Sequence, residues 1–287
     1  MARLTRLDAE LVRRSLAASR TEARELIDAG HVRVDGTVSL KPARQVNPAQ
    51  AIEVSAPKET RYASRGAHKL LSALDYLGED APPLDGVRAL DAGASTGGFT
   101  DVLLRRGAAS VVAVDVGYGQ LAWHLQRDPR VEVHDRTNVR TLAPEDIAPA
   151  PELVVADLSF ISLTLVIPNL ARCARPDATY LIMVKPQFEV GRERVGKGGV
   201  VRNPDLHAQA VRDVARSAED ADLTVWAVAP SALPGPAGNV EYFLALSGPE
   251  STPPREPLTG AQLDSAVARA IADGPASQRH ERAGGRR

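Results

Sequence analysis

Four acid-base side chains stand beside apolar segments of this 287-residue chain. They are Lys69, Asp157 closing LVVAD, Lys185 following LIMV, and Glu241 opening VEYFLAL. A lysine directly after an apolar strand is costly to bury unless it is paired with an opposite charge. An isolated ion pair would account structurally for any two of these residues. Two lysines and two carboxylates at one end of a sheet would also serve proton transfer.

A glycine-rich turn follows the apolar run VRAL, where Leu90–Thr100 reads LDAGASTGGFT. A dinucleotide fingerprint requires G-x-G-x-x-G, and a phosphate loop ends in G-K-[ST], so neither signature is met. Acids flank the turn instead: Asp91 precedes it, and Asp115 ends the next apolar run. An acid beside the turn suits a cationic ligand, and a carboxylate at the second strand end can accept both hydroxyls of a ribose.

S-adenosylmethionine combines a ribose with a sulfonium and an amino group, and it is the cofactor that the turn predicts. Asp135, which ends VEVHD, is expected to reach the adenine amine, with a surface acid as the alternative reading. Phe160 is expected to line the donor pocket, although an aromatic residue in an apolar stretch is by default core. No metal site is predicted. The residues expected to bind the cofactor are Asp91, Gly93, Ser95, Gly97, Gly98, Phe99, Thr100, Asp115, Asp135 and Phe160.

A methyl donor requires an acceptor and a base. A sugar hydroxyl holds its proton tightly, so its attack on a sulfonium methyl needs a base in contact. Desolvation and a second nearby ammonium favour loss of the lysine proton. We therefore expect Lys185 to be the base and Lys69 to be the second ammonium. Asp157 and Glu241 are expected to hold the ammonium groups and the substrate in line.

The elements that must position these residues alternate between apolar runs and helical segments. Because five of the runs are nearly continuous in Val, Leu, Ile and Ala, they are typical of strands buried on both faces of a parallel sheet. The prediction is an α/β fold, with a doubly wound, mostly parallel, Rossmann-like methyltransferase sheet. The runs are VRALD, VVAVD, VEVHD, LVVAD, TYLIMV, LTVWAVA and VEYFLAL.

The ends of the chain have a different organisation. Residues 3–57 predict a small α+β domain, with two short helices followed by a strand, HVRVDG, and a hairpin turn. A linker at 58–66 leads to a helix at 67–77, which begins the methyltransferase domain at 67–250. A C-terminal helix is expected at 258–274, and residues 275–287 are polar, basic and expected to be disordered.

Composition restricts the class of protein. One cysteine, Cys173, excludes an internal disulfide framework and fits a reducing compartment. The charged N-terminus has no apolar signal core, and no segment is long and apolar enough to span a membrane. We expect a soluble, cytoplasmic monomer that does not bind membranes. The net charge is only -1, but residues 1–69 hold 13 Lys and Arg against 8 Asp and Glu, as expected of a phosphate-binding module.

The N-terminal pattern resembles the alpha-L RNA-binding fold first seen in a small-subunit ribosomal protein. The resemblance implies that basic residues of the two helices and the hairpin meet RNA phosphates, whereas each one alone is equally typical of a solvated charge. The matching residues are Arg6, Leu7, Asp8, Leu11, Ser19, Arg20, Ala23, Leu26, Ile27, Gly30, Val32, Val34, Asp35 and Gly36. The implied RNA contacts are Arg3, Arg6, Arg20, Arg24 and Lys41.

Six motifs together resemble the TlyA family of ribosomal RNA 2′-O-methyltransferases. They are SRGAHKL at 64–70, DAGASTGGFT at 91–100, DVGYGQL at 115–121, ADLSFISL at 156–163, VKPQFE at 184–189 and GNVEYF at 238–243. The resemblance implies that Lys69, Asp157, Lys185 and Glu241 match the family's catalytic tetrad. It also implies a cytidine 2′-hydroxyl in 16S or 23S rRNA as substrate, reached on ribosomal subunits.

Three other functions compete with this one. A pseudouridine synthase also pairs an alpha-L domain with a catalytic domain, but its catalytic Asp lies in G-R-L-D, and here R-L-D occurs only at Arg6–Asp8 without the glycine. A membrane-damaging hemolysin would need a spanning or strongly amphipathic apolar segment. The third alternative is a non-catalytic ribosome-binding protein with a relic methyltransferase fold, which the filled tetrad disfavours.

Overall fold

The structure is a computed structural model that describes residues 4–14, 16–17, 20–28, 30–55, 62–196, 198–235 and 237–275. The chain divides into two compact units, Met1–Arg65 and Gly66–Arg287. This division lies within the linker expected at 58–66. Arg3, residues 58–61 of that linker and nearly all of the tail expected at 275–287 lie outside the described residues.

The N-terminal unit packs two helices against short strands around a core that includes Leu7, Leu11, Ile27 and Val32. β2 pairs with β3 and β5 in an antiparallel sheet, and β1 pairs separately with β4. Arg6 was expected on a helix but ends β1, because the chain pairs with β4 before the helix begins. The elements are β1 Thr5–Arg6, α1 Leu7–Arg13, α2 Arg20–Asp28, β2 Val32–Val34, β3 Thr37–Val38, β4 Gln45–Val46 and β5 Ile52–Val54.

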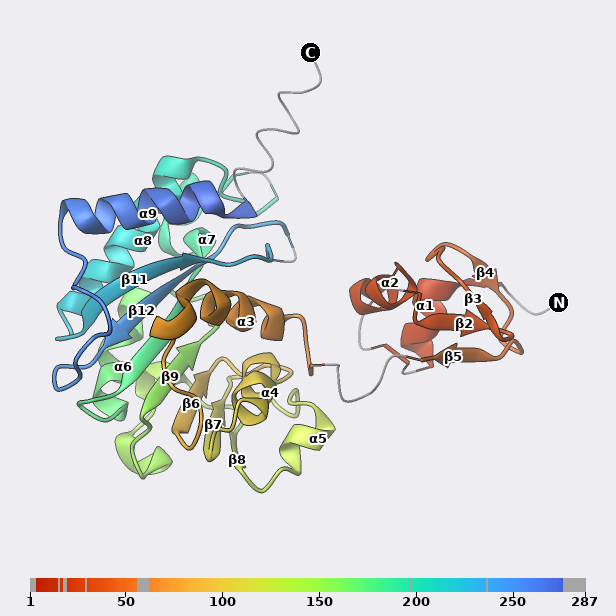
Figure 1. Ribbon diagram of the computed structural model, residues 1–287, viewed down its shortest axis with the longest axis horizontal. Helices are drawn as coiled ribbons and strands as arrows, with labels where there is room; N and C mark the ends of the chain where they lie inside the picture. The colour runs from red at the N-terminus through yellow and green to blue at the C-terminus, as the bar shows by residue number, and fades with distance from the viewer. Residues whose placement is uncertain are drawn as a thin grey trace, which may run out of the picture. The chain divides into compact units, whose positions relative to one another are not determined.

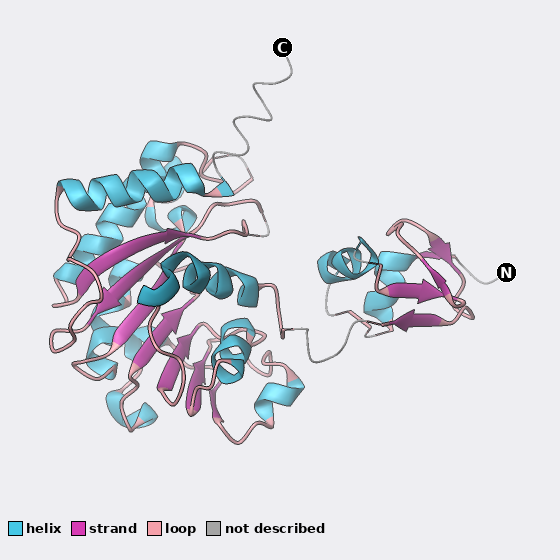
Figure 2. Ribbon diagram, in the orientation of Figure 1, coloured by secondary structure: helices cyan, strands magenta, loops and turns pink. Residues whose placement is uncertain are grey.

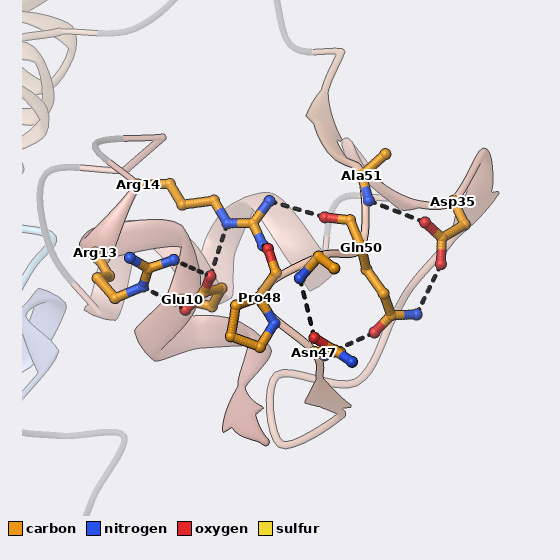
Figure 3. Close-up of polar contacts among 9 residues, drawn as sticks. Glu10, Arg13, Arg14, Asp35, Asn47, Pro48, Gln50 and Ala51 are labelled. Atoms are coloured by element: carbon orange, nitrogen blue, oxygen red, sulfur yellow. Dashed lines mark hydrogen bonds and ion pairs between the residues drawn. The ribbon is translucent and has the colours of Figure 1, made fainter. Parts of the chain in front are cut away.

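A buried carboxylate ties α1 to the segment after β4 (Figure 3). Glu10 accepts hydrogen bonds from Arg13 at 2.6 and 2.7 Å and from Arg14 at 2.7 Å. Arg14 also donates to the backbone carbonyls of Pro48 and Gln50, each at 2.8 Å. We call Glu10, Arg13 and Arg14 the Glu10 cluster. It satisfies a carboxylate that would otherwise be costly to bury and closes the small domain on itself.

The C-terminal unit is built on a seven-stranded sheet in the order β11-β12-β10-β9-β6-β7-β8. All seven apolar runs form its strands, and β12 alone runs opposite to the other six, so the mostly parallel sheet is confirmed. The strands are β6 Arg88–Ala92, β7 Ser110–Val114, β8 Val131–His134, β9 Leu153–Ala156, β10 Thr179–Val184, β11 Thr224–Pro230 and β12 Tyr242–Ser247.

Helices cover both faces of this sheet (Figures 1 and 2). α3 packs against α4 and β11, whereas α8 packs against α6, α9 and β12. The α-helices are α3 Gly66–Leu77, α4 Gly98–Arg105, α5 Trp123–Gln126, α6 Ile167–Cys173, α7 Pro186–Glu189, α8 Pro204–Glu219 and α9 Ala261–Asp273. The 3-10 helices are Gly78–Asp80, Val139–Thr141, Pro144–Ile147, Leu163–Leu165 and Arg192–Arg194.

The sheet is buried between these layers, which explains the apolar runs. β9 and β12 are buried at every residue, and β10 is buried at every residue except its first. Side chains such as Val154, Ile182 and Leu244 share one large core with α6, α8 and α9. A strand covered on both faces can carry apolar residues at every position. Polar residues are therefore left to the strand ends, where the candidate site lies.

Candidate active site

The sheet topology brings the strand-end members of the predicted tetrad to one edge. β9 and β10 are parallel neighbours, so Asp157 and Lys185 both follow strands that end at that edge. β12 runs the other way, and Tyr242 pairs with Val184. The residue before β12, Glu241, therefore lies beside the residue after β10, Lys185. Lys69 reaches the same place from the first turns of α3.

The four residues form two ion pairs. Nζ of Lys69 lies 2.5 Å from Oε2 of Glu241, and Nζ of Lys185 lies 2.6 Å from Oδ1 of Asp157. Lys185 also donates to Oγ of Ser159 at 2.8 Å. The side chains of Lys69, Lys185 and Glu241 are exposed by 10, 8 and 2%, so each lysine needs the carboxylate beside it. Each lysine thus has a carboxylate of its own.

Two neighbouring cavities open at this edge. The first, about 540 Å³, is lined by the glycine-rich turn and by Asp115, Asn138 and Asp157. The second, about 860 Å³, is lined by Lys69, Lys185 and Glu241. Both cavities include Ser159–Ile161 in their walls. The Lys185–Asp157 pair therefore joins a residue of the second cavity to a residue of the first.

The glycine-rich turn is shaped by close contact with the neighbouring strand end. Gly93 has φ +86°, and a Cβ atom there would lie 2.9 Å from the carbonyl oxygen of Asp157. Gly97 has φ +94°, and a Cβ there would collide with Leu125. Only glycine accommodates both the backbone conformation and the approach. Gly93 lines the first cavity, whereas Gly97 and Gly98 are buried behind it.

Asp115 follows β7 and lies on the wall of the first cavity. Its Oδ2 accepts from the backbone N–H of Ser95 at 2.8 Å, and its Oδ1 accepts from that of Gly117 at 2.7 Å. These bonds fix the carboxylate and leave further lone pairs on each oxygen. Asp135 accepts from the N–H of Gly119 at 2.8 Å but is not among the residues that line this cavity.

Asp91 is fully buried beneath the turn and does not line the cavity. Its Oδ2 accepts two hydrogen bonds from Thr100, from the backbone N–H at 2.8 Å and from Oγ1 at 2.6 Å. Burial raises the pKa of Asp91 to about 7. Phe99 is buried as well and stacks on Phe243, with ring centroids 6.1 Å apart. These three predicted residues anchor the first turn of α4 behind the cavity.

Phe160 lies between the two cavities and lines both. Its side chain is 92% exposed and its φ is +64°, an uncommon conformation for a residue with a side chain. Its ring centroid lies 5.2 Å from that of Phe188. The alternative expectation that Phe160 is a core aromatic is therefore wrong, because its ring is exposed on the wall that the two cavities share.

Sequence reasoning missed three residues of this edge. Asn138 lines the first cavity and, through Oδ1, accepts from the N–H of Arg140. Ser159 accepts from Lys185. Glu189 holds the loop between the cavities, since it accepts from Oγ of Ser162 at 2.6 Å and from the N–H of Leu163 at 3.0 Å. Ser159 and Glu189 stand inside motifs already noted, ADLSFISL and VKPQFE, which was the available signal.

Three of the predicted RNA contacts converge in the N-terminal unit. Arg6, Arg20 and Arg24 all donate to the carboxylate of Asp8. Lys41 is exposed after the β2–β3 hairpin. The arginines therefore have a common anchor that their spacing in the sequence did not predict.

Comparison with known proteins places this architecture in a family. Residues 62–247 match the FtsJ-like methyltransferase family and residues 5–52 match the S4 domain. The chain is 55% identical to the 16S/23S rRNA (cytidine-2'-O)-methyltransferase TlyA of Mycobacterium tuberculosis. The match runs over 275 residues and covers 96% of this chain and 100% of that protein. The chain belongs to the TlyA family of FtsJ-like methyltransferases.

Two further relatives match most of the chain. The 23S rRNA (cytidine-2'-O)-methyltransferase TlyA of Campylobacter jejuni is 30% identical, over 81% of this chain and 95% of its own. A solved structure from Streptococcus thermophilus, to which a hemolysin activity has been ascribed, is 32% identical with a TM-score of 0.72, over 98% of this chain and 100% of its own. In the described part of the chain, no helix is long and apolar enough to cross a bilayer.

Proposed function

We propose that this chain transfers a methyl group from S-adenosylmethionine to the 2′-hydroxyl of a cytidine in 16S or 23S ribosomal RNA. The observation that carries the proposal is the ion pair between the buried Lys185 and the partly buried Asp157, 2.6 Å long, between two neighbouring cavities. The proposal is also supported by family membership and by two relatives, from Mycobacterium tuberculosis and Campylobacter jejuni, that are named as rRNA (cytidine-2'-O)-methyltransferases.

The first cavity suits the donor. Its volume, about 540 Å³, lies in the range of cofactor sites, about 300–1,000 Å³. S-adenosylmethionine supplies an electrophilic methyl group on a sulfonium. Asp115 would accept from the ribose hydroxyls, because its anchored oxygens keep free lone pairs. Gly93, Ser95 and Asn138 would complete the wall, and the missing side chain of Gly93 leaves the turn close to Asp157.

The second cavity suits the acceptor ribose. Lys185 would take the proton of the 2′-hydroxyl on its neutral amine, and Asp157 would pair with the ammonium that results, while Ser159 helps to hold Nζ in place. Lys69 and Glu241 line the same cavity as an ion pair and would orient the substrate. Fixed geometry between the base and the hydroxyl supplies much of the acceleration in such transfers.

The N-terminal unit would hold the RNA. Its S4 match and its surplus of basic residues fit a phosphate-binding role, with Arg6, Arg20, Arg24 and Lys41 as proposed contacts. The proposed partner is ribosomal RNA in its subunits, which agrees with the cytoplasmic location expected from the sequence. The monomeric state and the domain limits of 3–57 and 67–250 stay predictions.

A direct assay tests the proposal. Ribosomal subunits from cells lacking 2′-O-methylation would be incubated with the full chain and tritiated S-adenosylmethionine, and the modified nucleotide would be mapped by primer extension and mass spectrometry. We expect 2′-O-methylcytidine in one or both RNAs. Binding of the subunits without transfer of label would instead support the non-catalytic alternative and overturn the enzymatic one.

A further inference from the structure

A fully buried carboxylate in the N-terminal unit collects three arginines. Asp8 accepts from Nε of Arg6 at 3.0 Å and from Nη2 of Arg6 at 2.9 Å. It also accepts from Nη2 of Arg20 at 2.9 Å and from Nε of Arg24 at 3.4 Å. The Asp8 side chain is 0% exposed, whereas those of Arg6, Arg20 and Arg24 are exposed by 40, 54 and 54%. We call these four residues the Asp8 cluster.

The Asp8 cluster joins three elements. Arg6 ends β1, Asp8 lies in the first turn of α1, and Arg20 and Arg24 stand four residues apart at the start of α2. Residues with that spacing share one face of a helix. Because α1 packs against α2, one carboxylate brings together cations that are distant in the sequence.

The charges of the Asp8 cluster do not balance. Hydrogen bonds from Arg6 and Arg20 hold the pKa of Asp8 well below its usual range, so this carboxylate is ionised near neutral pH. One negative charge therefore faces three guanidinium groups, which leaves a surplus of two positive charges at half-exposed side chains. A phosphodiester carries one negative charge, and its oxygens match the planar fork of arginine.

The Glu10 cluster provides a contrast in the same unit. There Arg14 is only 22% exposed, and it donates to the carbonyls of Pro48 and Gln50 (Figure 3). That cluster closes the domain on itself. Within the described part of the chain, the side-chain hydrogen bonds of the Asp8-cluster arginines go to Asp8 alone, and their side chains stay 40–54% exposed.

We propose that Asp8 is a positioning residue for RNA: it holds Arg6, Arg20 and Arg24 as one preformed site for a backbone phosphate. A free arginine side chain loses rotamer entropy when it is fixed. Arginines already held by Asp8 have lost part of that freedom before RNA arrives, so binding is tighter. The proposal rests on the proposed function, because RNA is the substrate named there.

The substitution Asp8→Asn distinguishes positioning of the arginines from attraction by net charge alone, because the two predict opposite changes in RNA affinity. Removing a negative charge would tighten RNA binding if only net charge mattered. Loss of positioning weakens it, by about tenfold for one charge-assisted hydrogen bond. The measurement is fluorescence anisotropy of the full chain with a labelled RNA duplex. In steady-state assays, KM for ribosomal subunits should rise by a similar factor while kcat is unchanged.

Matched variants complete the test. Glu53→Gln removes the same charge from an exposed position of β5 and should bind RNA as tightly as wild type or more tightly. Glu10→Gln should lower the melting temperature with a smaller effect on RNA affinity than Asp8→Asn. If Asp8→Asn does not fold by circular dichroism, Asp8→Glu replaces it, since it keeps the charge and displaces the carboxylate.

Two results would overturn the positioning role: undiminished RNA affinity in folded Asp8→Asn, or undiminished affinity in folded Asp8→Glu where that variant is used. The anisotropy assay requires no methyl transfer. A wild-type chain that binds RNA but does not methylate ribosomal subunits would therefore contradict the proposed function. The RNA affinities of the Asp8 variants would still test the positioning role of Asp8.

Discussion

Nζ of Lys185 lies 2.6 Å from Oδ1 of Asp157, and this pair joins the wall of one cavity to the wall of the other. The relationship follows from the parallel pairing of β9 and β10, which ends both strands at one edge. The Asp157 carboxylate fixes the position of the Lys185 amine and pairs with its protonated form. The first prediction concerns this amine.

Replacing Lys185 by alanine should lower methyl transfer to ribosomal subunits by about 100- to 10,000-fold, the usual contribution of a general base. Lys185→Arg keeps the charge beside Asp157 but cannot lose its proton, so it should be equally inactive. Single-turnover transfer of tritiated methyl groups measures the rate, and calorimetry should show that both variants still bind S-adenosylmethionine. An active Lys185→Arg would rule out the base assignment.

Glu241→Ala leaves the ammonium of Lys69 buried without its carboxylate, so the free energy of unfolding should fall by about 3–5 kcal/mol. Urea denaturation measures this change. The control is Asp264→Ala, which breaks the exposed pair with Arg212 and should alter stability by less than about 1 kcal/mol. A double variant, Lys69→Met with Glu241→Leu, should recover stability but not methyl transfer. Equal losses in Glu241→Ala and Asp264→Ala would contradict this prediction.

Gly93→Ala should lower the affinity for S-adenosylmethionine by about tenfold or more, because the new Cβ would press on the carbonyl of Asp157 and displace the turn. Gly86 provides a matched control, since its φ is +74° and a Cβ there meets nothing within 4 Å. Gly86→Ala should therefore show only the conformational cost of about 1 kcal/mol in stability. Calorimetric titration measures the affinity of both variants for S-adenosylmethionine. Equal affinities would contradict the claim that the close contact of Gly93 with Asp157 shapes the cofactor site.

The buried carboxyl of Asp91 should make stability depend on pH. Its pKa is about 7 in the folded chain and near 3.9 in an unfolded one. Between these values the folded state binds more protons, so the free energy of unfolding falls as pH rises from about 4 to about 7. The slope is about 1.4 kcal/mol per pH unit in the middle of that range. Asp91→Asn should flatten this part of a urea-denaturation series, and an unchanged slope would refute the raised pKa.

Arg6→Ala combined with Arg20→Ala should weaken binding to ribosomal RNA and reduce its salt dependence. Each lost phosphate contact lowers the slope of log K against log salt by about 0.7–0.9. Filter binding over a salt series measures the slope. Arg212→Ala, which removes one positive charge from α8, outside the N-terminal unit, serves as a control. An unchanged slope in the double variant would remove these arginines from the RNA-binding surface.

Much of the architecture could be predicted because its signals are local. A run such as LVVA must lie in a strand covered on both faces, and the run of glycines after VRAL must turn sharply, whatever the rest of the chain does. Seven strands of the large sheet, the bridging helix and the position of Asp115 at a strand end follow from such patterns. These local patterns did not predict the short strand β1, because it forms only by pairing with β4 about 40 residues later in the chain.

By itself, the sequence determined the fold class, the glycine-rich turn and which residues stand at strand ends, because strand and turn preferences act over a few neighbouring residues. Only the tertiary structure decided that Lys69 pairs with Glu241 and Lys185 with Asp157, that Asp91 lies beneath the turn, and that Asp8 gathers three arginines. The two lysine–carboxylate pairs, and the contacts of Asp8 with Arg20 and Arg24, join different elements of the chain. Their partners are selected by the antiparallel register of β12, the packing of α3 and the packing of α1 on α2.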